Sequence, residues 1–233
     1  MSEPLIAEAK GIRKLYDTRG VETLALDGID LAVHTGVFSA LAGPSGSGKT
    51  TLLNILGALD APTEGTVCIE GRDLAPLSSA ELSDLRMHKL GFVFQAYNLI
   101  PVFTARENVE FVMELQQVSR ADRKQRALEV LEEVGLGGLG DKRPLEMSGG
   151  QQQRVAVARA IVGRPAMVLA DEPTANLDSE TAARLLELME RLNRTHAITF
   201  LFSTHDPAVM EAARRVVRLR DGRIVSDDPK AEG

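Results

Sequence analysis

The stretch from Gly43 to Thr50 combines glycines, a lysine and a hydroxyl in a spacing that can hold phosphate groups. It reads Gly-Pro-Ser-Gly-Ser-Gly-Lys-Thr, which fits the pattern of glycine, four residues, Gly-Lys and then Ser or Thr. Glycines let successive backbone N–H groups wrap around an anion. Lys49 supplies a positive charge for the β- and γ-phosphates, and the Thr50 hydroxyl can bind Mg²⁺. The stretch therefore predicts a site for a nucleoside triphosphate.

Two adjacent acids, Asp171 and Glu172, follow the apolar run Met167–Ala170. A carboxylate at the carboxyl end of a strand lies beside the ligand crevice of an open α/β sheet. Asp171 suits Mg²⁺, directly or through its water shell. Glu172 suits a general base that orients or deprotonates a water for attack on the γ-phosphate. Taken alone, such a pair is as often a solvated loop or a helix cap. The phosphate-binding pattern favours the catalytic interpretation.

A second potential anion-binding device lies between these two sites. Ser148, Gly149, Gly150 and Gln151 precede the helical run Val155–Val162, so a hydroxyl and backbone N–H groups meet at the start of a helix. One nucleotide does not need two such devices from a single chain. We therefore expect that the two anion-binding sites of one copy do not bind the same nucleotide.

Strands and helices alternate around these residues. Buried or alternating apolar runs predict strands, and spacing near 3.6 residues predicts helices. The expected strands are Leu5–Ala9, Ala25–Val33, Val37–Ala42, Gly65–Glu70, Phe92–Phe94, Met167–Ala170 and Ala197–Ser203, with a terminal hairpin of Arg215–Arg218 and Ile224–Ser226. The expected helices are Thr50–Leu59, Ser79–Lys89, Glu107–Gln117, Arg120–Val134 and Ser179–Arg194. This order predicts an α/β fold with a mainly parallel sheet covered on both faces.

The motifs, taken in order, resemble those of the ABC (ATP-binding cassette) ATPases over nearly the whole chain. Ser148–Gln151 is similar to the family's signature motif, Gln95 to its Q-loop, Ala175–Asp178 to its D-loop and His205 to its H-loop. The resemblance implies one domain over residues 1–233. Its P-loop NTPase core, with an N-terminal antiparallel β subdomain, would span about 1–103 and 164–233, and an α-helical lobe would span about 104–163.

The resemblance also implies a role for each residue. ATP and Mg²⁺ are the implied ligands. Glu172, His205, Gln95 and Lys49 would be catalytic, and His205 would contact the γ-phosphate. Thr50, Gln95 and Asp171 would bind the metal, Tyr16 would stack on adenine and Asp178 would support the dimer interface. The nucleotide would contact Tyr16, Gly43, Pro44, Ser45, Gly46, Ser47, Gly48, Lys49, Thr50, Thr51, Gln95, Ser148, Gly149, Gly150, Gln151, Asp171 and Asp178.

In the family, the signature of one subunit faces the nucleotide of another, so the resemblance implies a homodimer that sandwiches ATP and separates after hydrolysis. It further implies a transmembrane permease as partner and a peripheral position on the cytoplasmic face of the inner membrane. The docking groove is expected near Gln95–Thr104. Its apolar residues could equally form the core of the lobe: Ala96, Tyr97, Leu99, Ile100, Val102 and Phe103.

Several segments are similar to the lipoprotein-releasing and macrolide-exporter branch of the family: Leu56–Asp60, Leu90–Gln95, Leu99–Pro101, Thr104–Val109 and Leu169–Asp178. Three positions depart from the common pattern, and none removes a catalytic group. Met147 replaces a leucine, Asn176 replaces a small residue and Val37 replaces a glutamate. Cargo in this branch depends largely on the membrane partner, so the sequence leaves it open.

Composition narrows the class of protein. No apolar stretch approaches the roughly 20 residues needed to cross a bilayer, and the first residues do not predict a secretory signal. Cys68 is the only cysteine, which excludes an internal disulfide and predicts a small core residue. The net charge of −6 argues against nucleic acid as the main partner.

Two alternatives to a transporter motor are a soluble ABC ATPase acting on DNA or the ribosome and a cell-division-type signalling subunit. The first is disfavoured because the chain carries one cassette and no sustained heptad repeat. The sequence hardly separates the second from a transporter motor.

Overall fold

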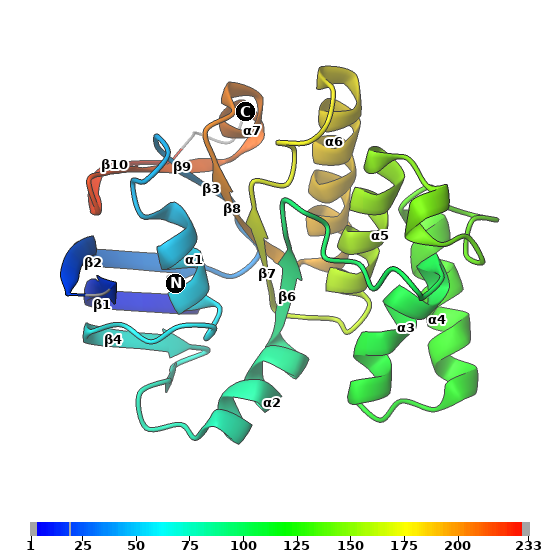
Figure 1. Cartoon of the computed structure of the whole chain (residues 1–233), viewed down its shortest axis with the longest axis horizontal. Helices are drawn as coiled ribbons and strands as arrows, with labels where there is room; N and C mark the ends of the chain where they lie inside the picture. The colour runs from blue at the N-terminus through cyan, green and yellow to red at the C-terminus, as the bar shows by residue number, and fades with distance from the viewer. Residues whose placement is uncertain (1–3, 19, 230–233) are drawn as a thin grey trace.

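The computed structural model describes residues 4–18 and 20–229, which form two β-sheets and a set of helices (Figure 1). The smaller sheet is antiparallel, with strand order β2-β1-β4-β5. Its strands are β1 (Leu5–Thr18), β2 (Val21–His34), β4 (Glu64–Ile69) and β5 (Arg72–Asp73). Residues 1–3, the start of the N-terminal stretch in which no secretory signal is predicted, lie outside the described part.

Strand β1 extends beyond the predicted Leu5–Ala9, and a β-bulge at the end of the predicted range explains the difference. Gly11 has φ +58°, in the left-handed region that glycine adopts most readily, and the pairing with β2 shifts between Ala9 and Ile12. A bulge breaks the alternation of apolar and polar residues, and that alternation was the sequence signal for the strand. The short strand β5 gave no such signal.

The larger sheet has the order β10-β9-β3-β8-β7-β6, and all its pairings are parallel except that between β9 and β10. The strands are β3 (Phe38–Ala42), β6 (Leu90–Val93), β7 (Met167–Asp171), β8 (Thr199–Thr204), β9 (Arg215–Arg220) and β10 (Arg223–Pro229). All residues of β3 and β8 are buried. Because β3, β6, β7 and β8 are parallel, their carboxyl ends meet at one edge of the sheet.

The helices are α1 (Lys49–Leu56), α2 (Ser79–Lys89), α3 (Ala105–Leu115), α4 (Arg120–Glu133), α5 (Gly149–Ile161), α6 (Ser179–His196) and α7 (Pro207–Ala212), with a 3₁₀ turn η1 (Pro144–Glu146). Ser78 and Thr104 begin α2 and α3 with capping boxes. Helix α7 was not predicted, because its six residues are too few to show a period. Every helix in residues 4–18 and 20–229 is too short or too polar to cross a bilayer.

Apolar side chains fill both faces of the larger sheet. On one face, Phe38, Phe200 and Phe202 pack ring against ring beneath the layer that contains α3, α4, α5 and α6. On the other face, Leu41 and Leu52 join the antiparallel sheet to α1. The α/β fold with a mainly parallel, doubly covered sheet is therefore confirmed. Cys68 is half-buried in β4, whereas a buried core position was expected.

Candidate functional site

The predicted phosphate loop connects β3 to α1 at the carboxyl edge of the larger sheet. A Cβ at Gly43 would lie 2.3 Å from the Leu219 carbonyl oxygen, and one at Gly48 would lie 2.7 Å from that of Ala25. Both positions therefore require glycine. The buried Lys49 ammonium donates to the carbonyls of Gly43 at 2.7 Å and Pro44 at 3.0 Å. Its charge is thus held inside the loop at the end of β3.

Asp171 and Glu172 lie opposite this loop at the end of β7. The Thr50 hydroxyl donates to Asp171 Oδ1 at 3.0 Å, and the Ser203 hydroxyl donates to the same oxygen. The Glu172 carboxylate lies 2.8 Å from His205 Nδ1 and 3.9 Å from Lys49 Nζ. Residues more than 120 positions apart in sequence are therefore in direct contact, because β3, β7 and β8 are adjacent in the sheet.

A cleft of about 600 Å³ runs over these groups. It is lined by Thr23, Leu24, Ala25, Pro44, Ser45, Gly46, Ser47, Gly48, Lys49, Thr50, Thr51, Gln95, Asp171, Glu172 and His205. The volume suits a nucleotide-sized ligand. The exposed Gln95 follows β6, so it reaches the cleft from the strand beside β7.

The predicted signature residues occupy a different surface of the same chain. Ser148 caps α5: its hydroxyl accepts the Gln151 backbone N–H at 3.3 Å, and the Gln151 side chain accepts the Ser148 N–H at 3.0 Å. This capping box starts α5 at Gly149, six residues before the predicted helical run. Ser148 is exposed, and Ser148–Gln151 are absent from the described lining of the cleft.

Comparison with known proteins decides the family. A profile of the ABC transporter family matches residues 26–175 of the chain. This range includes the phosphate loop, Gln95, Ser148–Gln151 and the two acids. The chain belongs to the ABC transporter family. It is an ATP-binding and ATP-hydrolysing subunit of that family, as the sequence resemblance implied.

Relatives of this ABC subunit fall in the expected branch. It is 47% identical to the lipoprotein-releasing system ATP-binding protein LolD of Anaeromyxobacter dehalogenans over 98% of each chain. It is 46% identical to the macrolide export ATP-binding/permease protein MacB of Syntrophobacter fumaroxidans over 94% of this chain but 31% of that protein. The solved dimeric, post-hydrolysis structure of the ATP-binding cassette MJ0796 bound to ADP and Pi has a TM-score of 0.90 and 39% identity. That match covers 97% of this chain and 100% of the other.

The predicted D-loop residues of the ABC subunit have local structural contacts. Asp178 caps α6, and its carboxylate accepts the Thr181 backbone N–H at 2.9 Å. This hydrogen bond lowers the pKa of Asp178 below its usual value. Asn176, one of the departures from the family pattern, donates to the Gln95 carbonyl at 2.9 Å. The departure therefore adds a link between the D-loop and the Q-loop.

Tyr16 lies outside the described lining of the cleft. Its hydroxyl donates to Asp60, just beyond the end of α1, at 2.7 Å. Lys14 donates to Asp60 at 2.7 Å, and its Nζ lies 4.8 Å from the centre of the tyrosine ring. Burial, followed by the bond to Asp60, raises the pKa of Tyr16. The ring is therefore fixed at its hydroxyl and covered on one face by a cation.

Sequence reasoning missed two contributors to the site. Ser203, which hydrogen-bonds to Asp171, was assigned only as the end of an apolar strand. Thr23, Leu24 and Ala25 line the cleft from β2, which belongs to the other sheet. Hydroxyls at strand ends near a predicted acid would have been a usable signal for Ser203. The chain gave no local signal for the β2 residues, because they reach the cleft through tertiary packing.

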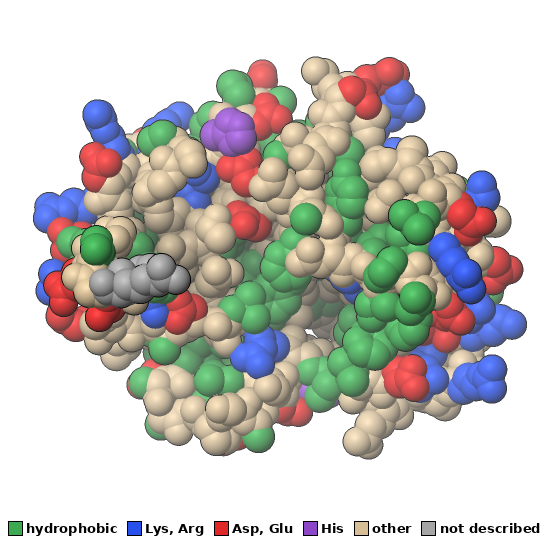
Figure 2. All heavy atoms as spheres, viewed as in Figure 1, with side chains coloured by type: hydrophobic (Ala, Val, Ile, Leu, Met, Phe, Trp, Pro, Cys, Tyr) green, Lys and Arg blue, Asp and Glu red, His purple; other side chains and the backbone are tan. Residues whose placement is uncertain are grey.

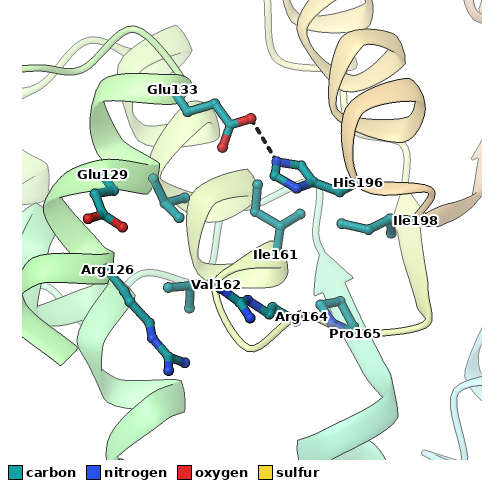
Figure 3. A pocket seen from close by; sticks show the side chains of 10 residues that line it. Arg126, Glu129, Glu133, Ile161, Val162, Arg164, Pro165, His196 and Ile198 are labelled. Carbon is teal, nitrogen blue, oxygen red and sulfur yellow. Dashed lines mark hydrogen bonds and ion pairs between the residues drawn. The ribbon is translucent and has the colours of Figure 1, made fainter. Parts of the chain in front are cut away.

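A separate cavity of about 320 Å³ lies away from these motifs, between α4, the α5–β7 connection and the end of α6 (Figure 3). Glu133 of α4 reaches His196 at the end of α6, with 2.7 Å between Oε1 and Nε2. Ile161, Val162 and Ile198 form an apolar floor, and Arg126 and Glu129 approach from α4. None of the predicted site residues lines this cavity, so it plays no part in assigning the nucleotide site.

Proposed function

We propose that this ABC ATPase works as a homodimer that closes over ATP and drives a transmembrane permease. The observation that carries the dimer is the separation, within one copy, of the phosphate loop from the Ser148–Gln151 helix end. Each device can bind an anion, yet only the first lines the cleft. A second, two-fold related copy would bring its signature to the open side of the cleft. The solved MJ0796 cassette with ADP and Pi is described as dimeric, which supports this arrangement.

In the proposed reaction, the backbone of Gly43–Gly48 and the start of α1 cradle the phosphates, and Lys49 exchanges its carbonyl partners for phosphate oxygens. Glu172 accepts a proton from, or orients, the attacking water, and His205 holds the Glu172 carboxylate while it contacts the γ-phosphate. Tyr16 stacks on adenine with its uncovered face. Asp178 stands at the dimer interface, and Gln95 reports on the nucleotide.

The residues around Thr50 fit Mg²⁺. A hydroxyl and a carboxylate 3.0 Å apart offer the hard oxygen ligands that this cation prefers, and Mg²⁺ typically needs only one or two protein ligands when a phosphate supplies others. When bound, the cation neutralises charge on the phosphates. Gln95 is proposed to join Thr50 and Asp171 around it.

The permease is proposed to dock in a groove of about 400 Å³ between α2 and β6 on one side and α3 and α5 on the other. Figure 2 shows hydrophobic side chains on both sides of a hollow on this face. Leu59 and Leu115 line this groove and are 48% and 53% exposed, so the groove presents apolar surface that a partner could cover. The groove lies beside Gln95–Thr104, the segment near which the sequence predicts docking. In this segment Val102 is exposed, whereas Leu99 packs on the core.

A membrane partner is supported by the fused relatives. The MacB protein of Syntrophobacter fumaroxidans is named as both ATP-binding protein and permease, and this chain spans only 31% of it. We propose that this subunit lies peripherally at the cytoplasmic face of the membrane, with its lobe of about 104–163 toward the permease. We expect the membrane partner, rather than this subunit, to determine which class of cargo is transported.

Mixing two inactive variants tests the dimer. Lys49→Ala damages the phosphate loop, and Ser148→Arg damages the signature. In a mixed dimer of the two, one composite site is doubly damaged and the other is intact. We expect each variant alone to be inactive and the mixture to recover roughly a quarter of parental ATP turnover, given random pairing and independent sites.

The control is a mixture of Lys49→Ala with Glu172→Gln, which damage the same half-site and should not complement. Absence of complementation in the first mixture, with both proteins folded and able to exchange partners, would show that the signature does not act across a dimer. Equal loss of ATP binding in Lys49→Ala and Ser148→Arg monomers would contradict the proposal as well.

A further inference from the structure

Ser203 is a fully buried serine at the end of β8, directly across from Asp171 of β7 in the parallel pairing. The rest of this strand is buried too, and Phe200, Leu201 and Phe202 precede it. An apolar residue would satisfy packing here at least as well as serine. The hydroxyl therefore calls for an explanation beyond burial.

Its hydrogen bonds join the two acids of the site. Ser203 Oγ donates to Asp171 Oδ1 and accepts the Glu172 backbone N–H at 3.2 Å. The Ser203 carbonyl accepts the same N–H at 3.1 Å. One residue thus holds the carboxylate of Asp171 and the main chain of Glu172 at once.

The main chain of Glu172 needs such support. Its φ is +48°, in the left-handed region that residues with side chains rarely adopt and keep only where the surroundings hold them. His205, two residues after Ser203, contacts the Glu172 carboxylate at 2.8 Å. Ser203 in β8 and His205 just after this strand therefore hold Glu172 at its backbone and at its side chain.

We propose that Ser203 is a positioning residue for ATP hydrolysis. It fixes one oxygen of Asp171 so that the carboxylate faces the Thr50 hydroxyl, and it holds Glu172 in its left-handed conformation. This inference rests on the proposed roles of Asp171 in metal binding and Glu172 as general base. Residues that orient a metal ligand through hydrogen bonds commonly contribute as much to metal affinity as to rate.

The test compares two variants of nearly equal size, Ser203→Val and Ser203→Thr, each larger than serine by a similar volume. Ser203→Val loses both hydroxyl bonds, whereas Ser203→Thr keeps a hydroxyl that can make them. Mn²⁺ binding is titrated by electron paramagnetic resonance in the presence of a non-hydrolysable ATP analogue. We expect Ser203→Val to weaken Mn²⁺ affinity about tenfold and Ser203→Thr to stay near the parental value. Affinity for the metal-free analogue should be unchanged in both.

Ser39 provides a matched control. It is a buried serine on the neighbouring strand β3, and its hydroxyl has no hydrogen-bond partner among the described residues. Ser39→Val should leave Mn²⁺ affinity intact. If Ser203→Val binds Mn²⁺ like the parent, or if the Val and Thr variants and Ser39→Val all lose affinity equally, the inference is overturned.

Two further variants, Ser203→Ala and Asp171→Asn, distinguish a failure of the Ser203 inference from a failure of the proposed metal role of Asp171. Ser203→Ala, which creates no steric clash, replaces the Val variant if that protein does not fold. Asp171→Asn should lose Mn²⁺ affinity whatever the role of Ser203. Retained affinity in Asp171→Asn would refute the proposed metal role itself. Loss there with no loss in Ser203→Val or Ser203→Ala would refute only the role of the serine.

Discussion

At the scale of single residues, the side chains with predicted functional roles already form hydrogen bonds and ion pairs within the site. Thr50 contacts Asp171, His205 contacts Glu172, and Lys49 is fixed by two carbonyls of its own loop. Local motifs predicted a functional role for each of these side chains, because each motif is contiguous in sequence. It did not identify Ser203 as the partner of Asp171 or Asp60 as the partner of Tyr16, since those contacts join residues 32 and 44 positions apart. Such tertiary contacts are not encoded in a local spacing.

Asp178 gives a prediction for the pH dependence of stability. Its pKa is lowered in the folded chain, so its ionised form stabilises the fold. This contribution is fully present above the unfolded pKa of about 3.9 and is lost as pH falls through the lower folded value. We expect Asp178→Ala to lower the thermal midpoint by a few degrees at pH 7, with the difference from the parent shrinking below about pH 4.

Thermal unfolding of parent and variant at a series of pH values checks this prediction. Ser148→Ala is a suitable comparison, because Ser148 caps α5 with a neutral partner, Gln151, and its effect should not follow pH in the same way. A difference between parent and Asp178→Ala that stays constant down to pH 3 would contradict an ionised cap.

At the scale of elements, long periodic segments were predictable and irregular ones were not. The ends of α2 were predicted as found, Ser79–Lys89, because Ser78 marks its start. Strand β1 was predicted too short, since the Gly11 bulge interrupts its pattern, and α7 was missed. The contact between β6 and α5 gave no sequence signal either. It depends on Gly91, where a Cβ would lie 2.3 Å from the Ala160 carbonyl oxygen.

Gly91→Ala should therefore destabilise the protein. The clash is with backbone, which cannot move aside as a side chain can, so overpacking should cost about 1–3 kcal/mol in the free energy of unfolding. Urea denaturation measures it. Gly140→Ala is the control, because a Cβ there would meet its nearest atom at an ordinary 3.5 Å. Equal midpoints for Gly91→Ala and the parent would show that β6 and α5 can separate freely.

At the scale of the whole molecule, the phosphate loop lines the cleft and Ser148–Gln151 do not. The α/β fold and the family could be predicted from motif order, and both are confirmed by the comparisons. Which surfaces meet in an assembly could not be derived from one chain, because assembly depends on shape and on the ligand. The proposed role of ATP in holding two copies together gives a prediction for Glu172.

Glu172→Gln should bind ATP yet lose hydrolysis by about 10²–10⁴-fold, the usual contribution of a general base. With the nucleotide intact, the dimer should persist. Sedimentation velocity with ATP and with ADP measures this, and dimer is expected with ATP alone. Lys49→Ala should remain monomeric in both. A Glu172→Gln protein that hydrolyses at the parental rate would show that another group activates the water.

The anchoring of Lys49 has a thermodynamic consequence for ligand capture. A free lysine side chain samples many rotamers, and immobilising one costs up to about 2 kcal/mol of conformational entropy. Here the Lys49 side chain is 7% exposed, and its ammonium is already held at 2.7 and 3.0 Å by carbonyls of its own loop. That ordering occurs when the chain folds. Binding of a triphosphate therefore does not have to order the Lys49 side chain. The entropic penalty of binding at this position should be smaller for that reason.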